Sequence, residues 1–488
     1  MKKVLAFDIG ASSGRAMLGT FNGDTIEIEE IHRFLNDPVT INGTMYWDIL
    51  RLFYELKQGL IKAGLKHQID SIAVDTWGVD FGLLDKAGYL LENPVHYRDK
   101  RTKGMLEKAF ENISREEFYE ITGNQFMEIN TVFQVLSLTT FRKELLDRAD
   151  TLLLIPDLIN YFFTGIKVTE YSIASTTQLI NARERTWDAK LLKTLGIPDR
   201  LFTTIVPSAT QIGKLSSDIC KELKVEECDV VAVAGHDTQC ALAAVPAKEE
   251  DFVFLSCGTW SLMGTELERP LINEKSNRYN ITNEGGYGGR ASFLKNITGL
   301  WIIQESRRWW IKEGREYGFL ELEKMAEEAE PFLCFIDPDS EEFSQTGNMP
   351  DKIREYCRRT GQEVPEGIGA IVRCINESLA LKYRLVLEEI KECTEQDYKA
   401  LYMVGGGIQS KLLCQFTSSA CNLKVIAGPV EATVYGNVVL QLIAAGTVKD
   451  LTEAREIIRR SEEPVEYEPV GEKEWRVALA RYKKLLSL

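Results

Sequence analysis

The first part of the chain alternates short apolar runs with turns of small residues. Residues 4–7 and 16–21 are apolar runs on either side of such a turn, and residues 25–34 place isoleucines among acids. This pattern predicts three β-strands. Across residues 49–63 the apolar positions recur every three or four residues, which is the spacing of one face of an α-helix. A fourth strand is expected at residues 71–74.

The same order of elements recurs in the second half. Strands are predicted at residues 252–255 and 262–267, and a strongly periodic helix spans 371–390. A further strand at 401–404 ends in three consecutive glycines, residues 405–407. The remaining predicted elements are a helix, a strand and a helix at residues 409–420, 424–427 and 432–445. Two halves with one plan indicate a duplicated architecture.

The length of the chain supports a division into domains. Single hydrophobic cores stop growing at roughly 250–300 residues, whereas this chain has 488. We therefore predict an α/β fold with two domains, residues 1–246 and 247–488, facing each other across a central cleft and joined near residues 246–250. Trp475, Leu479 and Tyr482 have helical spacing, so a closing helix is expected on the second domain.

Charge and apolar patterning exclude several classes of function. The formal net charge is −15, and a surface of that sign repels polyanions, so neither a nucleic-acid partner nor an anionic membrane is expected. A membrane span needs about 18 uncharged apolar residues, and we find no such run. The apolar run at the N-terminus is interrupted by Asp8, which makes it too short for a signal peptide. The sequence does not indicate an oligomeric state.

The ten cysteines show no C-x-x-C pair and no cluster with histidine. This spacing predicts neither a zinc site nor a secreted disulfide framework, and it favours a reducing cytoplasm. Oxidation could join Cys357 to Cys374, or Cys414 to Cys421, but spacing alone does not decide this. We expect free thiols.

Residues 7–15 combine an acid with a turn of small residues. Asp8 ends the first predicted strand, and glycine and serine follow. Small residues let backbone N–H groups approach a phosphate chain, and an aspartate at this point can hold Mg²⁺ through water. A plain hairpin turn is the open alternative. The segment is not a Walker loop, because the G-x-x-x-x-G-K-[ST] pattern is absent.

Two segments of the second half suit the same nucleotide. The turn at residues 256–261 has small polar residues that could cradle the terminal phosphates. The glycines at 405–407 lie between a strand and a helix N-terminus, where they leave room for a flat ligand such as adenine. A simple hairpin and tight strand-to-helix packing are the respective alternatives.

Gly235, His236, Asp237 and Thr238 follow the apolar strand expected at residues 230–234. An aspartate at the carboxyl end of a strand can act as a general base toward a hydroxyl group. Alternatively, this segment caps the helix that follows. A serine or cysteine nucleophile is less favoured, because the chain has only four histidines and none lies in a hydrolase motif.

Residues 75–81 suit a polyol ligand. Thr76 and Asp80 offer hydrogen bonds to hydroxyl groups, and Trp77 offers a flat face to the C–H groups of a sugar. A buried tryptophan with a satisfied aspartate is the open alternative. Residues 96–99 are expected to form a solvated loop, with polar contacts at the rim of the sugar site as the open alternative.

Taken in order, these segments resemble the FGGY carbohydrate kinases over residues 3–446. The motifs that carry the resemblance are FDIGASSGR (7–15), DTWGVDFGLLD (75–85), YRD (97–99), GHDT (235–238), CGTWSL (257–262), NITGLW (296–301) and GGGIQS (405–410). Each motif alone is weak, whereas the ordered set is specific.

The resemblance implies two ribonuclease-H-like (actin-type) domains and transfer of the γ-phosphoryl group of ATP, with Mg²⁺, to the 1-hydroxyl of L-rhamnulose. Asp237 would be the catalytic base and Asp8 the carboxylate near the metal. The implied sugar contacts, with Thr76 and Trp77 added from their own chemistry, are Gly78, His236, Asp237, Thr238 and Asn296. The implied ATP contacts are Ala11, Ser12, Ser13, Gly14, Arg15, Thr259, Gln304, Gly405 and Gly406.

Within this resemblance, the pair His236-Asp237 and the GASSGR turn imply L-rhamnulose as the acceptor rather than D-xylulose or glycerol. Another ketose or polyol, such as L-ribulose, D-xylulose or glycerol, is the open alternative. The competing hypothesis from another class is an actin-like ATPase without a sugar pocket. Residues 75–81 and Asn296 argue for the kinase.

Overall fold

The computed structural model describes residues 1–249 and 251–487, and these form two compact units. Unit 1 comprises Met1–Ala244, Glu266–Phe293 and Ala432–Ser461, and unit 2 comprises Val245–Thr265, Leu294–Glu431 and Glu462–Leu488. Glu250 and Leu488, which end the predicted joint and the predicted second domain, lie outside the described residues. The predicted boundary at 246/247 follows the chain, whereas these units follow contacts, so that boundary stays a prediction.

Unit 1 is built on a six-stranded sheet with the order β13-β14-β6-β1-β2-β3. Its strands are β1 (Lys2–Ile9), β2 (Ser13–Phe21), β3 (Ile26–Leu35), β6 (Ser71–Thr76), β13 (Thr210–Lys214) and β14 (Asp229–Ala232). Strand β1 is antiparallel to β2 and parallel to β6, and β14 is parallel to β6. The four strands predicted in this part of the chain are confirmed.

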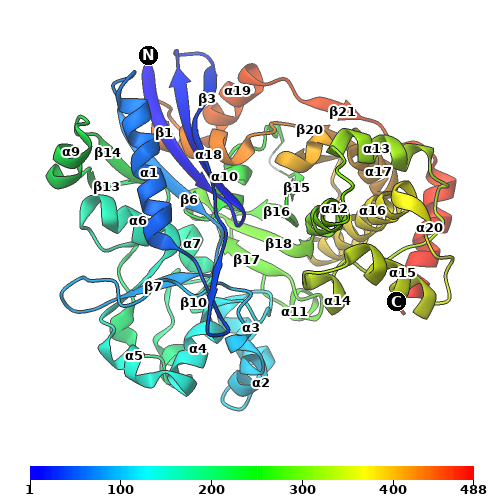
Figure 1. Ribbon diagram of the computed structural model, residues 1–488, viewed down its shortest axis with the longest axis horizontal. Helices are drawn as coiled ribbons and strands as arrows, with labels where there is room; N and C mark the ends of the chain where they lie inside the picture. Colours follow the sequence, from blue (N-terminus) through cyan, green and yellow to red (C-terminus); the bar gives the residue numbers. More distant parts are fainter. Residues whose placement is uncertain (250, 488) are drawn as a thin grey trace. The chain divides into compact units, whose positions relative to one another are not determined.

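Helices cover both faces of this sheet (Figure 1). Helices α1 (Ile49–Gly64) and α6 (Ile155–Thr164) pack against Leu5 and Phe7 on one face. Helices α10 (Asp237–Ala243) and α18 (Ala432–Ala444) cover the other, where Ala73 is buried. Burying a leucine or phenylalanine contributes about 1.5–3 kcal/mol. Because side chains alternate along a strand, Asp8 and Asp75 lie on the face covered by α10 and α18.

Helices α10 and α18 approach each other closely at Gly436. A Cβ atom on Gly436 would lie 1.8 Å from the carbonyl oxygen of Cys240. Glycine in a helix interior costs up to about 1 kcal/mol relative to alanine. The close packing of the helix that carries Asp237 therefore requires glycine at this position.

We expect Gly436→Ala to lower the free energy of unfolding by about 2–3 kcal/mol, because overpacking forces the two helix backbones apart. Urea denaturation checks this. Gly318→Ala is the matched control, since a Cβ there meets nothing within 4 Å. An unchanged midpoint for Gly436→Ala would contradict the close approach.

The rest of unit 1 consists of shorter elements, several of which build a second apolar cluster. In that cluster β7 (Phe81–Leu84) and β8 (Thr151–Leu154) pair antiparallel beside α4 (Thr131–Phe141). The helices are α2 (Met105–Phe110), α3 (Arg115–Thr122), α4 (Thr131–Phe141), α5 (Lys143–Arg148), α7 (Tyr171–Ser175), α8 (Ala189–Thr194), α9 (Ser217–Leu223), α11 (Glu274–Arg278), α19 (Leu451–Ser461) and the 3-10 turns η1 (Lys100–Thr102), η2 (Asp199–Leu201) and η3 (Tyr287–Gly289). The strands are β4 (Val39–Ile41), β5 (Thr44–Tyr46), β7 (Phe81–Leu84), β8 (Thr151–Leu154), β9 (Thr169–Glu170), β10 (Ile180–Asn181), β11 (Thr186–Trp187), β12 (Ile205–Val206) and β17 (Thr282–Gly285).

The sheet of unit 2 repeats the strand plan of unit 1. Its strands are β18 (Ala291–Thr298), β16 (Trp260–Leu267), β15 (Val253–Cys257), β19 (Ala400–Val404), β20 (Lys424–Ala427) and β21 (Val465–Tyr467), and they pair in that order. Strand β15 is antiparallel to β16 and parallel to β19, as β1 is to β2 and β6. Both sheets end in an antiparallel edge strand. The recurrence predicted from the sequence is confirmed.

Helices of unit 2 build a core on which the C-terminal helix packs. The predicted helix at residues 371–390 is longer, running as α16 over Gly367–Thr394. Trp475 and Tyr482 of α20 (Glu472–Leu485) are buried against α16 and α17 (Lys411–Cys421). The remaining helices are α12 (Trp301–Lys312), α13 (Phe319–Glu328), α14 (Glu341–Ser344), α15 (Met349–Arg359) and the 3-10 turn η4 (Gly406–Gln409).

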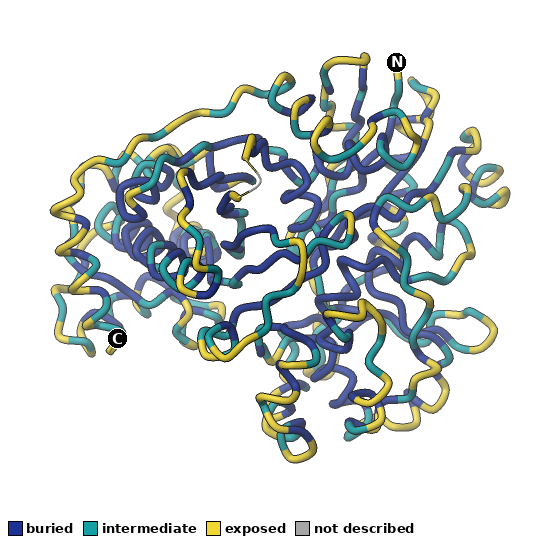
Figure 2. Tube along the Cα trace, turned by 180° about the vertical axis from the view of Figure 1, so that it is seen from behind, coloured by how far each residue is buried: buried dark blue, intermediate teal, exposed yellow. Residues whose placement is uncertain are grey.

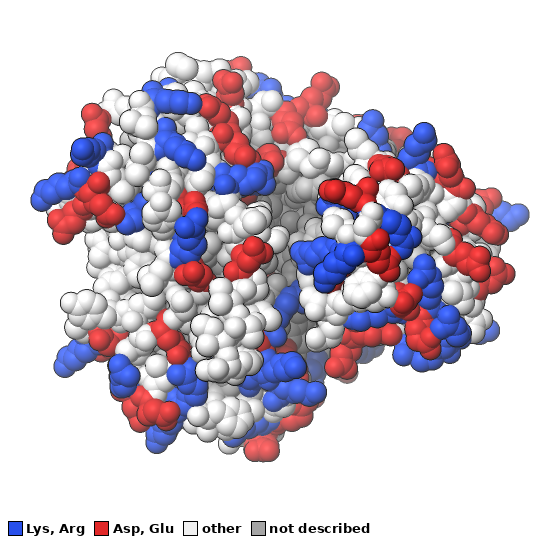
Figure 3. Space-filling view, viewed as in Figure 1, with Lys and Arg blue, Asp and Glu red and all other residues white. Residues whose placement is uncertain are grey.

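Burial follows the layers of the fold, whereas charges of both signs are mixed over the surface. The central strands are buried and the loops are exposed (Figure 2). Lysine and arginine alternate with aspartate and glutamate over the face in Figure 3. Within residues 1–249 and 251–487, no helix has both the length and the apolar character that a bilayer crossing requires.

All ten cysteines are free, as expected, but the structure corrects one expectation about their arrangement and excludes one of the two pairings left open. Cys334, Cys357 and Cys374 meet in space, with sulfur atoms within 4.8 Å of one another, although their spacing suggested no cluster. Cys414 and Cys421 lie on one helix, α17. Seven residues of helix span about 10.5 Å at 1.5 Å per residue, which exceeds the roughly 7 Å that a disulfide allows between Cα atoms.

Candidate active site

Three aspartates of unit 1 gather at one edge of its sheet. Asp8 and Asp75 occupy matched positions on the parallel strands β1 and β6. Next to them Thr76 pairs with His236, and the Thr76 N–H donates to the carbonyl of Gly235 at 2.9 Å. The carboxyl ends of parallel strands share an edge, so Asp237, at the start of α10, joins the other two. Asp8 and Asp75 both interact electrostatically with Asp237.

Asp237 presents a reachable carboxylate. It is the first residue of α10, and the N-cap is His236, which makes no capping hydrogen bond with its side chain. The Asp237 Oδ1 accepts from the backbone N–H and the hydroxyl of Thr238, at 2.6 and 3.1 Å, and the side chain is 31% exposed. Burial raises the pKa of Asp237 and His236 lowers it, while Asp8 raises it, with a net increase. Asp237 is therefore not the N-cap of α10, so helix capping does not explain why an aspartate occupies this position.

His236 is held by a glutamate that sequence reasoning missed. Its Nδ1 lies 3.0 Å from Oε2 of Glu284 on β17, and its Nε2 lies 3.5 Å from Asp237 Oδ1. The side-chain amide of Gln239 donates to the same Glu284 oxygen at 3.1 Å. Burial lowers the pKa of His236, but Glu284 and Asp237 raise it by more, so the pKa is raised overall. A protonated imidazole is therefore favoured beside Asp237.

Asp8 is paired across its own hairpin. Asp8 and Arg15 are cross-strand partners, and the guanidinium Nη2 lies 2.5 Å from Asp8 Oδ2. Both side chains are mostly buried, at 12% and 17% exposure. This pair places a cation next to the turn at residues 10–14.

Asp75 is the one carboxylate of the three with a buried oxygen that lacks a partner. Its Oδ2 accepts from Asn437 of α18 at 2.6 Å, whereas Oδ1 is buried with no hydrogen-bond partner among the described residues. Burial, followed by the charge of Asp8, holds the pKa of Asp75 well above its usual value. Neither Asp75 nor Asn437 was assigned a role from the sequence.

The turn between β1 and β2 leaves backbone donors available. Asn36 fixes it, since its side chain donates to the carbonyl of Gly10 at 2.9 Å and its N–H donates to Ser12 at 3.1 Å. The N–H groups of Ala11 and Ser12 donate to none of the described residues. A Cβ on Gly10 would lie 3.5 Å from its nearest neighbour, an ordinary contact, whereas one on Gly14 would overlap Phe34 at 2.3 Å. Close packing therefore explains why position 14 is glycine, but it does not explain the glycine at position 10. Ser13 begins strand β2.

A second group of predicted residues meets in unit 2. Thr259 lies in the turn between β15 and β16, and its hydroxyl is 3.3 Å from the side-chain carbonyl of Gln304 on α12. Gly405 follows β19 with φ 87°, and a Cβ there would lie 3.1 Å from the carbonyl of Cys257. Because β15 and β19 are parallel neighbours, this turn and these glycines lie at one edge.

The three glycines differ in what they do. A Cβ on Gly407 would overlap the sulfur of Cys257 at 2.3 Å, so tight packing accounts for Gly407. A Cβ on Gly406 would meet nothing within 4 Å, so its Cα borders open space. Asn296 lies apart on β18, which β16 separates from β15.

The segment proposed for the sugar is largely buried. Trp77 is 7% exposed, its indole N–H donates to Asp80 Oδ2 at 3.0 Å, and its ring lies 4.2 Å from that of Trp47. Thr76 is fully buried and donates to the carbonyl of Trp77 at 2.8 Å. This matches the alternative of a buried tryptophan with a satisfied aspartate. Gly78 remains partly exposed.

The expected solvated loop at residues 96–99 is wrong for its first two residues. His96 and Tyr97 are 5% and 6% exposed. The ring of His96 stacks on Trp47 at 4.1 Å, and the N–H of Tyr97 donates to Asp80 at 3.1 Å. Burial, then the charge of Arg98, lowers the pKa of His96 to about 3, so His96 is neutral. Trp47, distant in sequence, draws these polar residues inward.

Known families match both halves of the chain. Residues 3–244 match the model of the N-terminal domain of the FGGY family of carbohydrate kinases, and residues 253–445 match that of its C-terminal domain. The chain belongs to the FGGY family of carbohydrate kinases. It is therefore an ATP-dependent sugar kinase, as predicted.

Curated relatives and solved structures agree with this assignment. A rhamnulokinase of Bacteroides thetaiotaomicron is 43% identical over 98% of both chains, and one of Oceanobacillus iheyensis is 40% identical over 94% of this chain and 96% of the relative. A xylulose kinase from Lactobacillus acidophilus has a TM-score of 0.79 at 17% identity, covering 100% of this chain and 96% of that one. Plasmodium falciparum glycerol kinase with ADP has a TM-score of 0.80 at 16% identity, covering 100% and 98%. The predicted two-domain actin-type fold is confirmed.

The residues of this FGGY kinase fit a nucleotide and a divalent cation. The unpartnered Asp75 oxygen lies on the strand beside Asp8, and Mg²⁺ prefers one or two carboxylates together with phosphate oxygens. The Ala11 and Ser12 N–H groups suit phosphate, and the open face of Gly406 suits a flat base.

Asp80 gives this FGGY kinase a predicted pH dependence of stability. Its carboxylate accepts from Trp47, Trp77, Tyr97 and Gln134, but burial outweighs these bonds and raises its pKa from 3.8 to about 6. The folded state therefore binds more protons than the unfolded state between these values, so stability falls as pH rises. At 1.36 kcal/mol per pKa unit, the loss is up to about 3 kcal/mol.

Denaturation between pH 4 and 6 checks this through the difference between the unsubstituted chain and Asp80→Asn. The free energy of unfolding of the unsubstituted chain should fall relative to that of Asp80→Asn as pH rises, because the variant carries no titrating group at this position. Asp85→Asn, on the turn after β7, should keep the full pH dependence. Parallel curves for the unsubstituted chain and Asp80→Asn would contradict the raised pKa.

Proposed function

We propose that this kinase transfers the γ-phosphoryl group of ATP to the 1-hydroxyl of L-rhamnulose, forming L-rhamnulose 1-phosphate in rhamnose catabolism. The choice of L-rhamnulose as the acceptor rests on one observation. Over at least 94% of its length, this chain is 40–43% identical to proteins called rhamnulokinase. Fold neighbours include xylulose and glycerol kinases, but at 16–17% identity they bear on the fold alone.

Asp237 is the proposed general base. Its 31% exposed carboxylate ends a row of strand-end aspartates, and its raised pKa increases its affinity for a hydroxyl proton. A positioned base contributes about 10²–10⁴ to the rate. The Asp237 Oδ1 also accepts from Thr238, which fixes the direction of the carboxylate.

His236 is proposed to bind the sugar and to bias Asp237. Glu284 favours the protonated imidazole, which lies 3.5 Å from Asp237 and stabilises its charged form. The same N–H group can instead donate to a sugar hydroxyl. Thr238, Gly78 and Asn296 are the further proposed sugar contacts. Thr76 and Trp77 are proposed to support the sugar contacts through packing, because their polar side-chain atoms already form hydrogen bonds within the protein.

The nucleotide is proposed to bind through two sets of residues. In unit 1 these are Ala11, Ser12, Ser13, Gly14 and Arg15, and in unit 2 they are Thr259, Gln304, Gly405 and Gly406. Asp8, with Asp75 beside it, would hold Mg²⁺. Bound ATP with Mg²⁺ supplies the phosphoryl group and neutralises the charge that develops during transfer.

The compartment proposed for this reaction is the cytoplasm. Ten free cysteines, nine of them buried, suit a reducing environment.

A coupled assay of ADP release tests the acceptor. L-Rhamnulose, L-ribulose, D-xylulose and glycerol are compared at matched concentrations, with kcat/KM as the readout. We expect L-rhamnulose to exceed the others by at least tenfold. A higher kcat/KM for any other acceptor would overturn the proposed substrate. ATP turnover that no ketose stimulates would instead favour an actin-like ATPase.

A further inference from the structure

Three buried thiols of unit 2 form a cluster that phosphoryl transfer does not use. Cys334 lies in the loop between α13 and α14, Cys357 on α15 and Cys374 on α16. Their sulfur atoms all lie within 4.8 Å of one another, and the residues are 1%, 0% and 3% exposed. Among the described residues, this is the one group of three or more potential metal ligands at such spacing.

The spacing suits a thiolate-bound metal ion. A Zn–S bond is about 2.3 Å long, so sulfur atoms that share the ion lie roughly 3.8–4.0 Å apart. Small side-chain rotations reach this value from the observed cluster. Thiolates select zinc and other thiophilic ions over magnesium or calcium. The cluster therefore differs in chemistry from the carboxylates of unit 1.

Hydrogen bonds fix the backbone beside each of the three cysteines. The Gln362 side chain accepts from and donates to the backbone of the residue after Cys334, at 2.9 and 2.8 Å, and its N–H donates to the carbonyl of Cys357 at 2.9 Å. The Ser378 hydroxyl donates to the carbonyl of Cys374 at 2.6 Å and accepts from the loop at 2.9 Å. Such support orients the ligands of metal sites.

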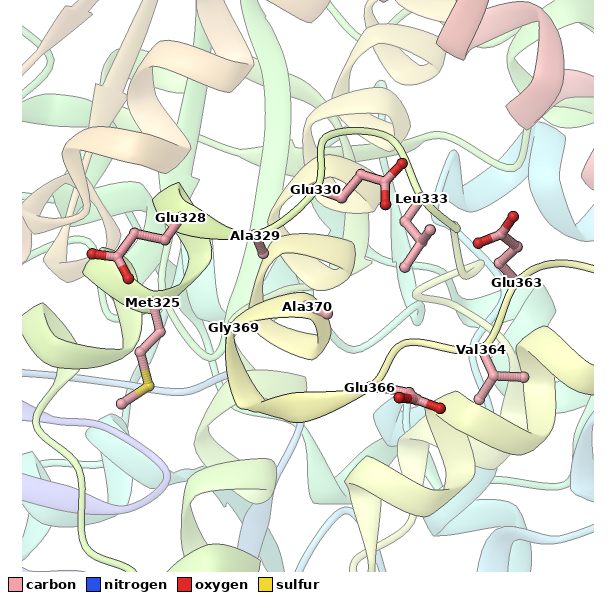
Figure 4. Close-up of a pocket in the computed structure, with 10 residues that line it drawn as sticks. All are labelled: Met325, Glu328, Ala329, Glu330, Leu333, Glu363, Val364, Glu366, Gly369 and Ala370. Carbon is pink, nitrogen blue, oxygen red and sulfur yellow. The ribbon is translucent and has the colours of Figure 1, made fainter.

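An acidic cavity borders the cluster. It has a volume of about 670 Å³, and Leu333, directly before Cys334, lies on its wall (Figure 4). Ala370 also lines it, one helical turn before Cys374 on the same face of α16. The exposed glutamates of its wall are Glu328, Glu330, Glu363 and Glu366. Carboxylates around a cavity concentrate cations, so this cavity raises the local concentration of a divalent ion close to the cluster.

We propose that Cys334, Cys357 and Cys374 bind one thiophilic divalent ion, of which Zn²⁺ is the probe. The three thiols lose three protons and form three metal–sulfur bonds, which leaves one net negative charge and involves no oxidation. Arg481 lies nearby, because its guanidinium donates to the carbonyls of Phe332 and Leu333 at 2.8 and 3.2 Å. The ion would link the loop, α15 and α16.

The test uses the full-length protein, reduced and handled without oxygen. Equilibrium dialysis against Zn²⁺, followed by elemental analysis, should give one zinc per chain. Co²⁺ should give a sulfur-to-metal charge-transfer band. Cys357→Ser should lose this band and weaken zinc binding more than about 10-fold, the lower range seen for loss of supporting groups alone. Cys421→Ser, an equally buried thiol outside the cluster, should keep both.

A second measurement keeps the proposal testable if Cys357→Ser does not fold. In the unsubstituted chain, Zn²⁺ should slow alkylation of Cys334, Cys357 and Cys374 and leave Cys414 and Cys421 unchanged, as peptide mapping reads out. Less than one zinc bound per reduced chain, equal protection of all five thiols, or zinc retained by folded Cys357→Ser would overturn the proposal.

Discussion

Asp237→Asn should lower kcat by about 10²–10⁴ without unfolding the protein, because an amide cannot accept the hydroxyl proton. The KM for the sugar should change by a small factor, since the amide side chain has nearly the same shape as the carboxylate that it replaces. A coupled assay of ADP release with L-rhamnulose measures both constants, and thermal denaturation checks the fold. In the unsubstituted chain, kcat/KM should rise with pH through a pKa above the ordinary 3.8, because the deprotonated carboxylate is active.

Asp218→Asn is the matched control for this variant. Asp218 lies on α9 of the same unit with a side chain 94% exposed, so its replacement should leave kcat unchanged. Turnover within threefold of normal in Asp237→Asn would contradict the proposed role of Asp237 as the general base. Parallel loss of kcat and melting temperature would indicate a structural role instead.

Asp8→Asn is expected to have the second largest effect, a fall in kcat of about 10²–10³, the range seen when one electrostatic group of a transition state is removed. The Mg²⁺ concentration for half-maximal rate should rise, because the variant loses the charge of the carboxylate proposed to lie near the metal beside Asp75. Titration of Mg²⁺ at fixed ATP measures this shift. The KM for the sugar should stay the same, since the proposed sugar contacts are other residues.

Asp8→Asn also breaks the ion pair with Arg15, so its control is a variant that breaks another aspartate–arginine pair. Asp24→Asn removes the ion pair with Arg460, 2.8 Å apart and 72% exposed at the aspartate. Exposed pairs contribute about 0–1 kcal/mol, so neither kcat nor the Mg²⁺ requirement should change. A normal Mg²⁺ titration in Asp8→Asn would contradict the proposed metal contact.

Much of the fold could be predicted because its signals are local. Alternation in β1 to β3 and the helical period of α1 and α16 depend on neighbours a few residues apart. The position of Asp237 after a buried strand was visible for the same reason. The order of the motifs along the chain indicated the FGGY family.

The partners of these residues could not be predicted, because distant segments supply them. Glu284 is 48 residues from His236, and Asn437 is 362 residues from Asp75. Neither lies in a motif. The polar residues at 96–99 predict a solvated loop, but the ring of Trp47, which is distant in sequence, stacks on His96 and buries it. The three clustered thiols come from a loop and two helices, so no spacing rule finds them.

The return of residues 432–461 to the first unit limits how this enzyme can be divided. A fragment that ends at residue 246 matches the N-terminal family domain, yet it lacks α18, which covers one face of the sheet and supplies Asn437 to Asp75. Such a fragment would expose Ala73 and Cys240 to water. Expression of the first half alone should therefore yield aggregates, and swapping halves between relatives should succeed only when the last helices travel with the first.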